Sequence, residues 1–279
     1  MLSLCLAMLS SALVSIVMRL SENKIKNKTA MLAVNYVVCA VTAALYAGPS
    51  ALFPGIEGLG TALGLGLIGG AFYLGGFILL QWNVGKNGIV LSATFGKLGV
   101  LVPTLMSILF FREVPTALQI LGLGLAFAAI LLIQLEGSEG SRAGHSLGLI
   151  VLLLVGGMTD GMSKIYERVG NPALESHFLF YIFLSALVLS VLVVLVKQQT
   201  AGPWELFFGL LVGVPNYFCS RFLLRALSSV PAVAAFPTYS VGSIVLVSLT
   251  GLFCFGEKLG RRRWAAMGVI LVSLALLNL

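Results

Sequence analysis

Charged residues are scarce in this sequence, and they are never gathered into a continuous polar face. Only 10% of the 279 residues are Asp, Glu, Lys or Arg, whereas 59% are hydrophobic and the mean hydropathy is +1.05. A soluble domain needs far more polar surface than this composition supplies. The composition therefore excludes a water-soluble globular protein and predicts a chain that uses lipid as its solvent.

Cysteine and histidine are also too few and too scattered for a metal centre, a disulfide framework or a hydrolase. The cysteines fall inside apolar runs without the paired spacing of a zinc site, and we interpret them as small buried hydrophobic residues: Cys5, Cys39, Cys219 and Cys254. The only histidines are His145 in a loop and His177 at a helix start, and Asp160 has no deep acidic partner. We therefore expect no metal, no cofactor and no intramembrane enzyme.

The positive charge of the chain does not indicate a nucleic-acid partner. The formal net charge is +7, but the basic residues sit between apolar runs, as anchors that flank membrane spans do. The first apolar run ends at Arg19 without a small-residue cleavage site, so we expect it to stay as the first helix. We expect a multi-pass protein in the lipid bilayer of a prokaryotic cell membrane. The distribution of basic residues among the loops predicts that both termini lie outside.

Apolar runs long enough to cross roughly 30 Å of hydrocarbon as helices recur along the whole chain. The sequence predicts an all-α membrane protein with ten transmembrane helices, at residues 1–20, 30–48, 60–82, 88–111, 115–135, 146–167, 176–196, 204–226, 232–254 and 262–279.

An internal repeat relates the two halves of the chain. A shift of 144 residues aligns, without a gap, Tyr73 with Tyr217, Phe95 with Tyr239, Glu113 with Glu257 and Gly124 with Gly268. A half with five helices reverses its orientation on duplication, which gives an inverted-topology repeat of the kind that builds secondary transporters. We predict a first five-helix repeat at 1–135, a connecting loop at 136–145 and a second five-helix repeat at 146–279.

One segment of the second half resembles a known family. Residues 239–257, Tyr-Ser-Val-Gly-Ser-Ile-Val-Leu-Val-Ser-Leu-Thr-Gly-Leu-Phe-Cys-Phe-Gly-Glu, with the Gly268-centred last helix, resemble the third and fourth helices of small multidrug resistance proteins. The preceding Leu-Leu-Arg-Ala-Leu-Ser-Ser-Val-Pro at 223–231 resembles the end of their second helix. Ten helices in two such halves are typical of the drug/metabolite transporter superfamily, in its EamA-like branch. The resemblance implies secondary active transport by alternating access around a midplane cavity.

The same resemblance leaves two kinds of cargo to compare. Small multidrug exporters carry a membrane-embedded glutamate in the first helix that exchanges protons for cationic drugs, and the matching position here is Ser11. No acidic residue precedes Glu22. We therefore expect export of a small polar metabolite, such as an amino acid or an organic anion, with a multidrug or cation exporter as the alternative. A channel is less favoured, because no ring or repeat of pore-lining residues stands out.

Polar side chains inside the spans are the candidate site, because an ionisable group in a membrane helix is costly and is kept for function. Lys97 is the strongest candidate, because it lies near the middle of its span, where snorkelling to an interface is hardest. The full set of substrate-binding candidates is Lys97, Phe95, Tyr239, Arg221, Asn216, Tyr217, Asn35 and Tyr73. The alternative for the two asparagines is that they simply join helices.

Asp160 and Lys164 lie one helical turn apart, which lets them form a coupling site or a self-neutralising ion pair. Asp160 is the only acid deep in a span, so coupling to a proton would run through it, and coupling to a counter-substrate is the other option. A monomer and a homodimer are both compatible with the sequence.

Small residues and prolines predict where helices approach closely or bend. Gly60-x-x-x-Gly64 and Gly66-x-x-x-Gly70 place glycines on one helix face, so that backbones can approach. Three prolines fall within spans, where each is either a hinge or a static kink: Pro103, Pro215 and Pro237. We interpret Glu113 and Glu257, at matching helix ends, as solvated loop charges.

Overall fold

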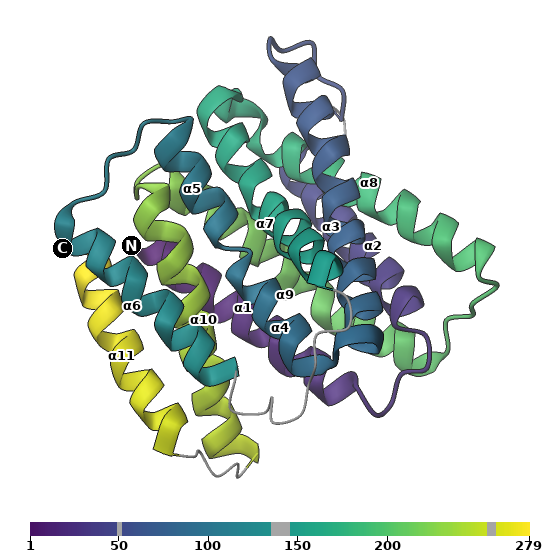
Figure 1. The fold of residues 1–279 in the computed structure, drawn as a ribbon. Helices are drawn as coiled ribbons and strands as arrows, with labels where there is room; N and C mark the ends of the chain where they lie inside the picture. Colours follow the sequence, from purple (N-terminus) through teal and green to yellow (C-terminus); the bar gives the residue numbers. More distant parts are fainter. Residues whose placement is uncertain (49–51, 135–145, 256–260) are drawn as a thin grey trace. The chain divides into compact units, whose positions relative to one another are not determined.

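The computed structural model describes residues 1–48, 52–134, 146–255 and 261–279, and the regular structure of these residues is entirely helical (Figure 1). The all-helical class predicted from composition is therefore confirmed. In chain order the elements are α1 (Leu2–Ser21), α2 (Lys28–Ala47), α3 (Leu59–Asn87), α4 (Ile89–Leu98), α5 (Leu101–Leu109), α6 (Ala117–Gln134), α7 (Ser146–Val169), the short 3₁₀ helix η2 (Pro172–Leu174), α8 (Glu175–Val196), α9 (Pro203–Leu227), α10 (Ala232–Phe255) and α11 (Arg261–Leu277).

Eight segments are long and apolar enough to cross a membrane as helices. They are Leu2–Ser21, Lys28–Ala47, Leu59–Asn87, Ser92–Leu109, Ser146–Val169, Pro172–Val196, Pro203–Leu227 and Ala232–Phe253. Two further apolar helices, Ala117–Leu132 and Trp264–Leu277, are shorter than 18 residues over the part that the structure describes. These spans make the chain a multi-pass membrane protein by length and composition.

The chain forms two compact units, and each unit combines segments from both ends of the sequence. Unit 1 contains Gly75–Lys164 and Ala226–Leu279, together with Met1, and unit 2 contains Leu2–Leu74 and Ile165–Arg225. The units group helices by packing, whereas the predicted halves describe a relation along the chain. The predicted halves therefore stay a prediction.

Unit 2 is built on the packing of α2 against α8 and of α3 against α8. A Cβ atom added at Gly66 would lie 2.5 Å from the Cβ of Tyr181, and one added at Gly70 would lie 2.5 Å from the carbonyl oxygen of Ile182. At Gly64, no described atom outside its own helix turn lies within 4 Å of such a Cβ. The predicted close approach of backbones therefore occurs at the second glycine pair, where α3 lies against α8.

In unit 2, the carboxylate of Glu205 links the loop between α1 and α2 to α9. Glu205 lies in the first turn of α9 and is 4% exposed. Its Oε1 accepts hydrogen bonds from the backbone N–H groups of Lys26 (2.7 Å) and Asn27 (3.1 Å), and its Oε2 accepts one from the N–H of Gly202 (3.1 Å). The α1–α2 loop is thereby fixed to the start of α9.

Replacing Glu205 with glutamine is expected to lower the free energy of unfolding by about 2 kcal/mol, because an amide NH₂ must then face a backbone donor. The measurement is the loss of helical circular dichroism of the detergent-solubilised protein during titration with sodium dodecyl sulfate. Glu57→Gln, at an exposed side chain, is the matched control and is expected to change little. Equal stabilities of the two variants would contradict the bridging role of Glu205.

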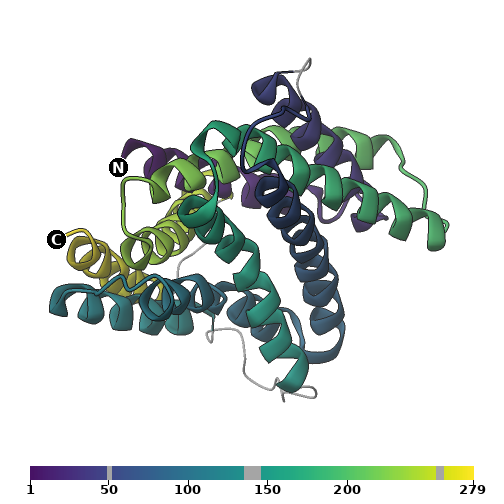
Figure 2. The ribbon, with the colours of Figure 1, turned by 90° about the horizontal axis from the view of Figure 1, so that it is seen from above.

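Unit 1 is built on the extensive contact of α6 with α11, which lie side by side in Figure 2. Gly122 makes this approach close, because an added Cβ would lie 3.0 Å from the side chain of Leu277 and its carbonyl accepts a hydrogen bond from Ser273 Oγ at 2.8 Å. The buried residues of the core beside it are all aliphatic: Ala126, Ala129, Ile130, Val241, Ile244 and Ile270.

The span predicted as one helix at 88–111 is divided by the structure into α4 and α5. The physical reason is Pro103, which has no N–H to donate to the carbonyl of Gly99. That carbonyl instead accepts a shorter-range hydrogen bond from the N–H of Val102 at 2.9 Å, so the backbone tightens into a turn. At Pro215 and Pro237 the helices continue through the proline. Of the three expected bends, only that at Pro103 interrupts a helix.

The cysteine interpretation is correct for Cys39 and Cys219, which are buried, and wrong for Cys5, which is exposed on α1. An exposed small residue on an apolar span needs no packing partner. The side chain of Cys254, together with His145 and Glu257, lies outside the described residues.

Candidate functional site

In unit 2, amide and hydroxyl groups from three helices form one connected group, which we call the amide–hydroxyl cluster: Asn35 on α2, Tyr73 on α3, and Asn216 and Ser220 on α9. Asn216 Nδ2 donates to Asn35 Oδ1 at 3.1 Å, and the hydroxyls of Tyr73 and Ser220 are 2.9 Å apart. Ser220 Oγ also donates to the carbonyl oxygen of Asn216 at 3.4 Å. The structure therefore joins three predicted residues through Ser220, a residue that was not predicted from the sequence.

Asn35 is fully buried in the cluster, and its Nδ2 donor has no hydrogen-bond partner among the described residues. The oxygen of the same amide is paired, because Asn35 Oδ1 accepts the hydrogen bond from Asn216 Nδ2. A buried amide donor without a partner carries a desolvation cost of about 1–3 kcal/mol. Such a donor is suited to an oxygen atom of a bound ligand or water.

Aromatic rings support the same cluster from one side. The ring of Phe183 lies edge-on to Tyr73 with centroids 5.7 Å apart, and 6.1 Å from the ring centroid of Tyr217. Tyr217 in turn stacks on Tyr46 at 5.7 Å. Phe183 and Tyr46 were not predicted, because the shift of 144 residues pairs them with Cys39 and Ser190 and not with another aromatic residue.

Arg221 is the only predicted cationic candidate that belongs to unit 2, and it is held from three sides. Its Nη1 donates to the hydroxyl of Tyr217 at 2.9 Å and to Ser176 Oγ at 3.1 Å. Its guanidinium carbon lies 4.0 Å from the ring centroid of Tyr46, which is a short cation–π contact. Ser176 and Tyr46 lie near the ends of α8 and α2, so Arg221 is placed toward the end of its span rather than at the middle.

In unit 1, Lys97 and Asp160 interact electrostatically and are both half-buried. Lys97 lies in the last turn of α4, directly before the break at Gly99. A break in a membrane helix exposes backbone groups at depth, and transporters use such places to bind cargo and ions. The structure therefore places Lys97, the strongest candidate from the sequence, within electrostatic reach of Asp160. The other two candidates of this unit, Phe95 and Tyr239, are half-buried on α4 and α10.

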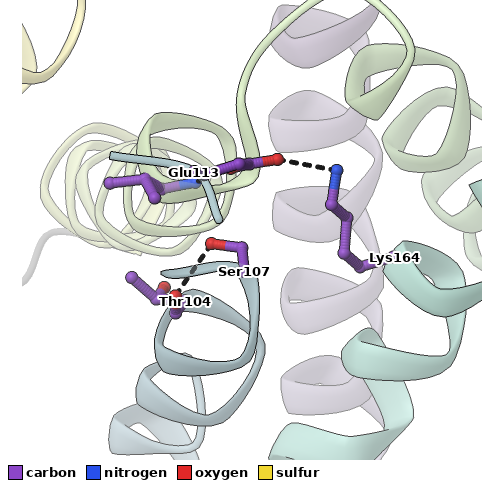
Figure 3. A network of polar contacts seen from close by, with 5 residues as sticks. Thr104, Ser107, Glu113 and Lys164 are labelled. Carbon is purple, nitrogen blue, oxygen red and sulfur yellow. Dashed lines mark hydrogen bonds and ion pairs between the residues drawn. The ribbon is translucent and has the colours of Figure 1, made fainter. Parts of the chain in front are cut away.

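Lys164 forms an ion pair with Glu113, with Nζ and Oε1 2.7 Å apart and side chains that are 5% and 19% exposed (Figure 3). Glu113 Oε2 also accepts a hydrogen bond from the N–H of Val233, at the start of α10, at 3.1 Å. A carboxylate at a helix N-terminus is stabilised by the unpaired N–H groups there. The interpretation of Glu113 as a solvated loop charge is therefore wrong, and the pairing of Lys164 with Asp160 stays a prediction.

The backbone fixes Glu113 in this position. Its N–H donates to the carbonyl of Ser107 at 3.1 Å, and Ser107 Oγ donates to the carbonyl of Thr104 at 2.8 Å, as Figure 3 shows in part. Arg112 has a φ of +55°, in the left-handed region, which turns the chain back after α5. This contact could not be predicted from the sequence, because Glu113 and Lys164 are far apart along the chain.

A groove of about 540 Å³ lies between α1 and α9 in unit 2, and its lining differs from that of the amide–hydroxyl cluster because it is apolar. It is lined by Ser10, Leu13, Val17, Leu210, Leu211, Val214, Pro215, Phe218 and Phe222. Its walls are almost entirely apolar, which suits a hydrocarbon chain and not a polar cargo. Within the described part of the chain, no three His, Cys, Asp or Glu side chains come together so that they could hold a metal ion.

Comparisons with known proteins establish the fold of this chain. No family model matches the chain. Over 199 residues it is 26% identical to an uncharacterised protein of Haemophilus influenzae, across 70% of this chain and 67% of that protein. A solved crystal structure superimposes with a TM-score of 0.79 at 12% sequence identity, and the match covers 99% of this chain and 94% of the other. This likeness, at so low an identity, shows that the two share a fold along nearly their whole length.

Proposed function

We propose that the chain is a secondary active transporter that moves a small polar metabolite, such as an amino acid or an organic anion, across a bacterial plasma membrane by alternating access. The observation that carries the proposal is the amide–hydroxyl cluster, where apolar spans bring amides and hydroxyls together and leave the buried Asn35 donor without a described partner. A purely structural contact between helices has no use for an unsatisfied donor in a membrane.

The proposed architecture is that of an EamA-like member of the drug/metabolite transporter superfamily, with ten spans in two inverted repeats. Its support is the spacing of helix starts: α2 and η2 begin at Lys28 and Pro172, and α3 and α9 begin at Leu59 and Pro203, in each case 144 residues apart. Helices related by this shift also pack together, since α2 contacts α8 within unit 2 and α6 contacts α11 within unit 1. Contact between equivalent helices is expected for a repeat with a pseudo-two-fold axis.

The proposal is tested by reconstituting the purified protein in liposomes and measuring uptake of radiolabelled amino acids, organic acids, sugars and nucleotides. We expect saturable, gradient-dependent uptake of one of these classes. Lys97→Ala is expected to lower the initial rate about tenfold or more if the cargo is anionic, since one lost charge contact is worth about 1.4 kcal/mol or more. Lys86→Ala, at an exposed side chain of α3, is the matched control. Undiminished uptake of every anionic cargo by Lys97→Ala would contradict the role of Lys97.

Coupling is tested in the same liposomes with an imposed proton gradient. We expect Asp160→Asn to keep exchange of cargo across the membrane and to lose the acceleration by the gradient, because an amide carries no exchangeable charge. Gradient-driven uptake at the wild-type rate would remove Asp160 from coupling and favour a counter-substrate. Ethidium uptake instead of metabolite uptake would favour the alternative, a multidrug or cation exporter.

A further inference from the structure

The guanidinium of Arg221 is oriented by protein contacts along one edge and across one face. The hydroxyls of Tyr217 and Ser176 accept hydrogen bonds from Nη1, and the ring of Tyr46 covers one face of the guanidinium. Tyr46 itself is 50% exposed, and Arg221 is half-buried, so the group can be approached by a ligand. A long side chain loses considerable rotamer entropy when it is held so firmly.

The remaining edge of this guanidinium is open. Its Nη2 and Nε donate to no residue that the structure describes, and no described carboxylate lies within ion-pair distance of it. Glu175 interacts electrostatically with Arg225 and Arg221, so these three side chains together carry one net positive charge. The local charge therefore matches a ligand group with a single negative charge.

We propose that Arg221 binds the carboxylate group of the transported molecule through this open edge, an inference that rests on the proposed function. A guanidinium with two parallel N–H groups in one plane matches the two oxygens of a carboxylate. The aromatic ring beneath it keeps that plane fixed, as preorganised sites require. A phosphate dianion would leave one negative charge without a local counterpart, so the geometry and the charge favour the carboxylate.

The repeat makes this site a feature of the second half alone. A shift of 144 residues pairs Tyr217 with Tyr73, but it pairs Arg221 with Phe77. The tyrosine is thus kept in both halves, whereas the cation occurs once. One carboxylate per cargo molecule is consistent with one such cation.

The test uses phenylglyoxal, which modifies accessible arginines, on the full-length protein in phosphatidylcholine liposomes. Peptide mass spectrometry follows the modification of Arg221, with the exposed Arg168 as an internal reference. At saturating concentration, propionate and benzoate are expected to slow the modification of Arg221 about threefold or more. The reason is that a carboxylate bound to the guanidinium shields it from phenylglyoxal. Their uncharged twins, propionamide and benzamide, are expected to leave the rate unchanged. The reference Arg168 should react at one rate throughout.

The outcomes separate this inference from the proposed function, because protection does not depend on transport. Equal protection by the amides, no protection by any carboxylate, or protection only by added phosphatidylglycerol would overturn the carboxylate site. Protection without transport of any solute would overturn the proposed function and leave the site intact. Tyr217→Phe is expected to weaken protection, because it removes one of the two hydrogen bonds that orient Nη1. Tyr181→Phe, which loses a hydrogen bond to Leu52 in the same unit, is expected to leave protection unchanged.

Discussion

Replacing Gly70 with alanine is expected to lower the free energy of unfolding by about 3 kcal/mol, the upper end of the usual cost of overpacking. The new Cβ would lie 2.5 Å from both the carbonyl oxygen of Ile182 and the Cβ of Ser185, and 2.7 Å from the backbone nitrogen of Ala186. Two of these atoms belong to the backbone of α8 and can move only if the whole helix moves. The packing of α3 on α8 in unit 2 would therefore be lost or displaced.

Gly64→Ala is the matched control, on the same helix and with the same change of one methyl group. No described atom beyond its own helix turn lies within 4 Å of the Cβ that it would gain. Alanine is a better helix former than glycine by about 1 kcal/mol, so this variant is expected to be neutral or slightly more stable. Both variants are compared by titration with sodium dodecyl sulfate, followed by helical circular dichroism. A Gly70→Ala protein as stable as Gly64→Ala would contradict the close contact with α8.

Replacing Glu113 with glutamine is expected to cost about 3 kcal/mol of unfolding free energy, because it removes the anion at 2.7 Å from a lysine that is only 5% exposed. The ring of Phe111, with its centroid 5.8 Å from Lys164 Nζ, is a weaker partner for the ammonium group. The same change weakens the contact with the N–H of Val233, so the start of α10 is expected to loosen as well.

A second substitution tests the cause of this loss. The double variant Glu113→Gln, Lys164→Met removes the buried cation together with its anion and is expected to recover at least half of the lost stability, since an apolar side chain pays no desolvation cost. Glu22→Gln, at an exposed glutamate after α1, is expected to change the stability by no more than about 0.5 kcal/mol. A double variant as unstable as Glu113→Gln alone would mean that the ion pair is not what stabilises this corner of unit 1.

Within the candidate site, the sequence predicted residues but not their pairings. Asn35 and Asn216 stand out in apolar helices because each is polar, which is a property of one position. Their hydrogen bond spans 181 residues of chain, and only the packing of α2 and α9 brings it about. The same holds for Lys164. The sequence predicted Asp160, one helical turn away, as its partner, whereas the structure shows an ion pair with Glu113, which follows α5.

The sequence by itself determined the helical class and the positions of most spans, since the free energy of placing a segment in lipid depends on the local run of side chains. The predicted span 204–226 and the observed α9 at Pro203–Leu227 illustrate this agreement. Only the tertiary structure decided that Pro103 divides one span, that Glu113 is an ion-pair partner, and that Arg221 keeps an open edge above Tyr46. These depend on which atoms meet across helices, and hydropathy along one chain contains no information about such contacts.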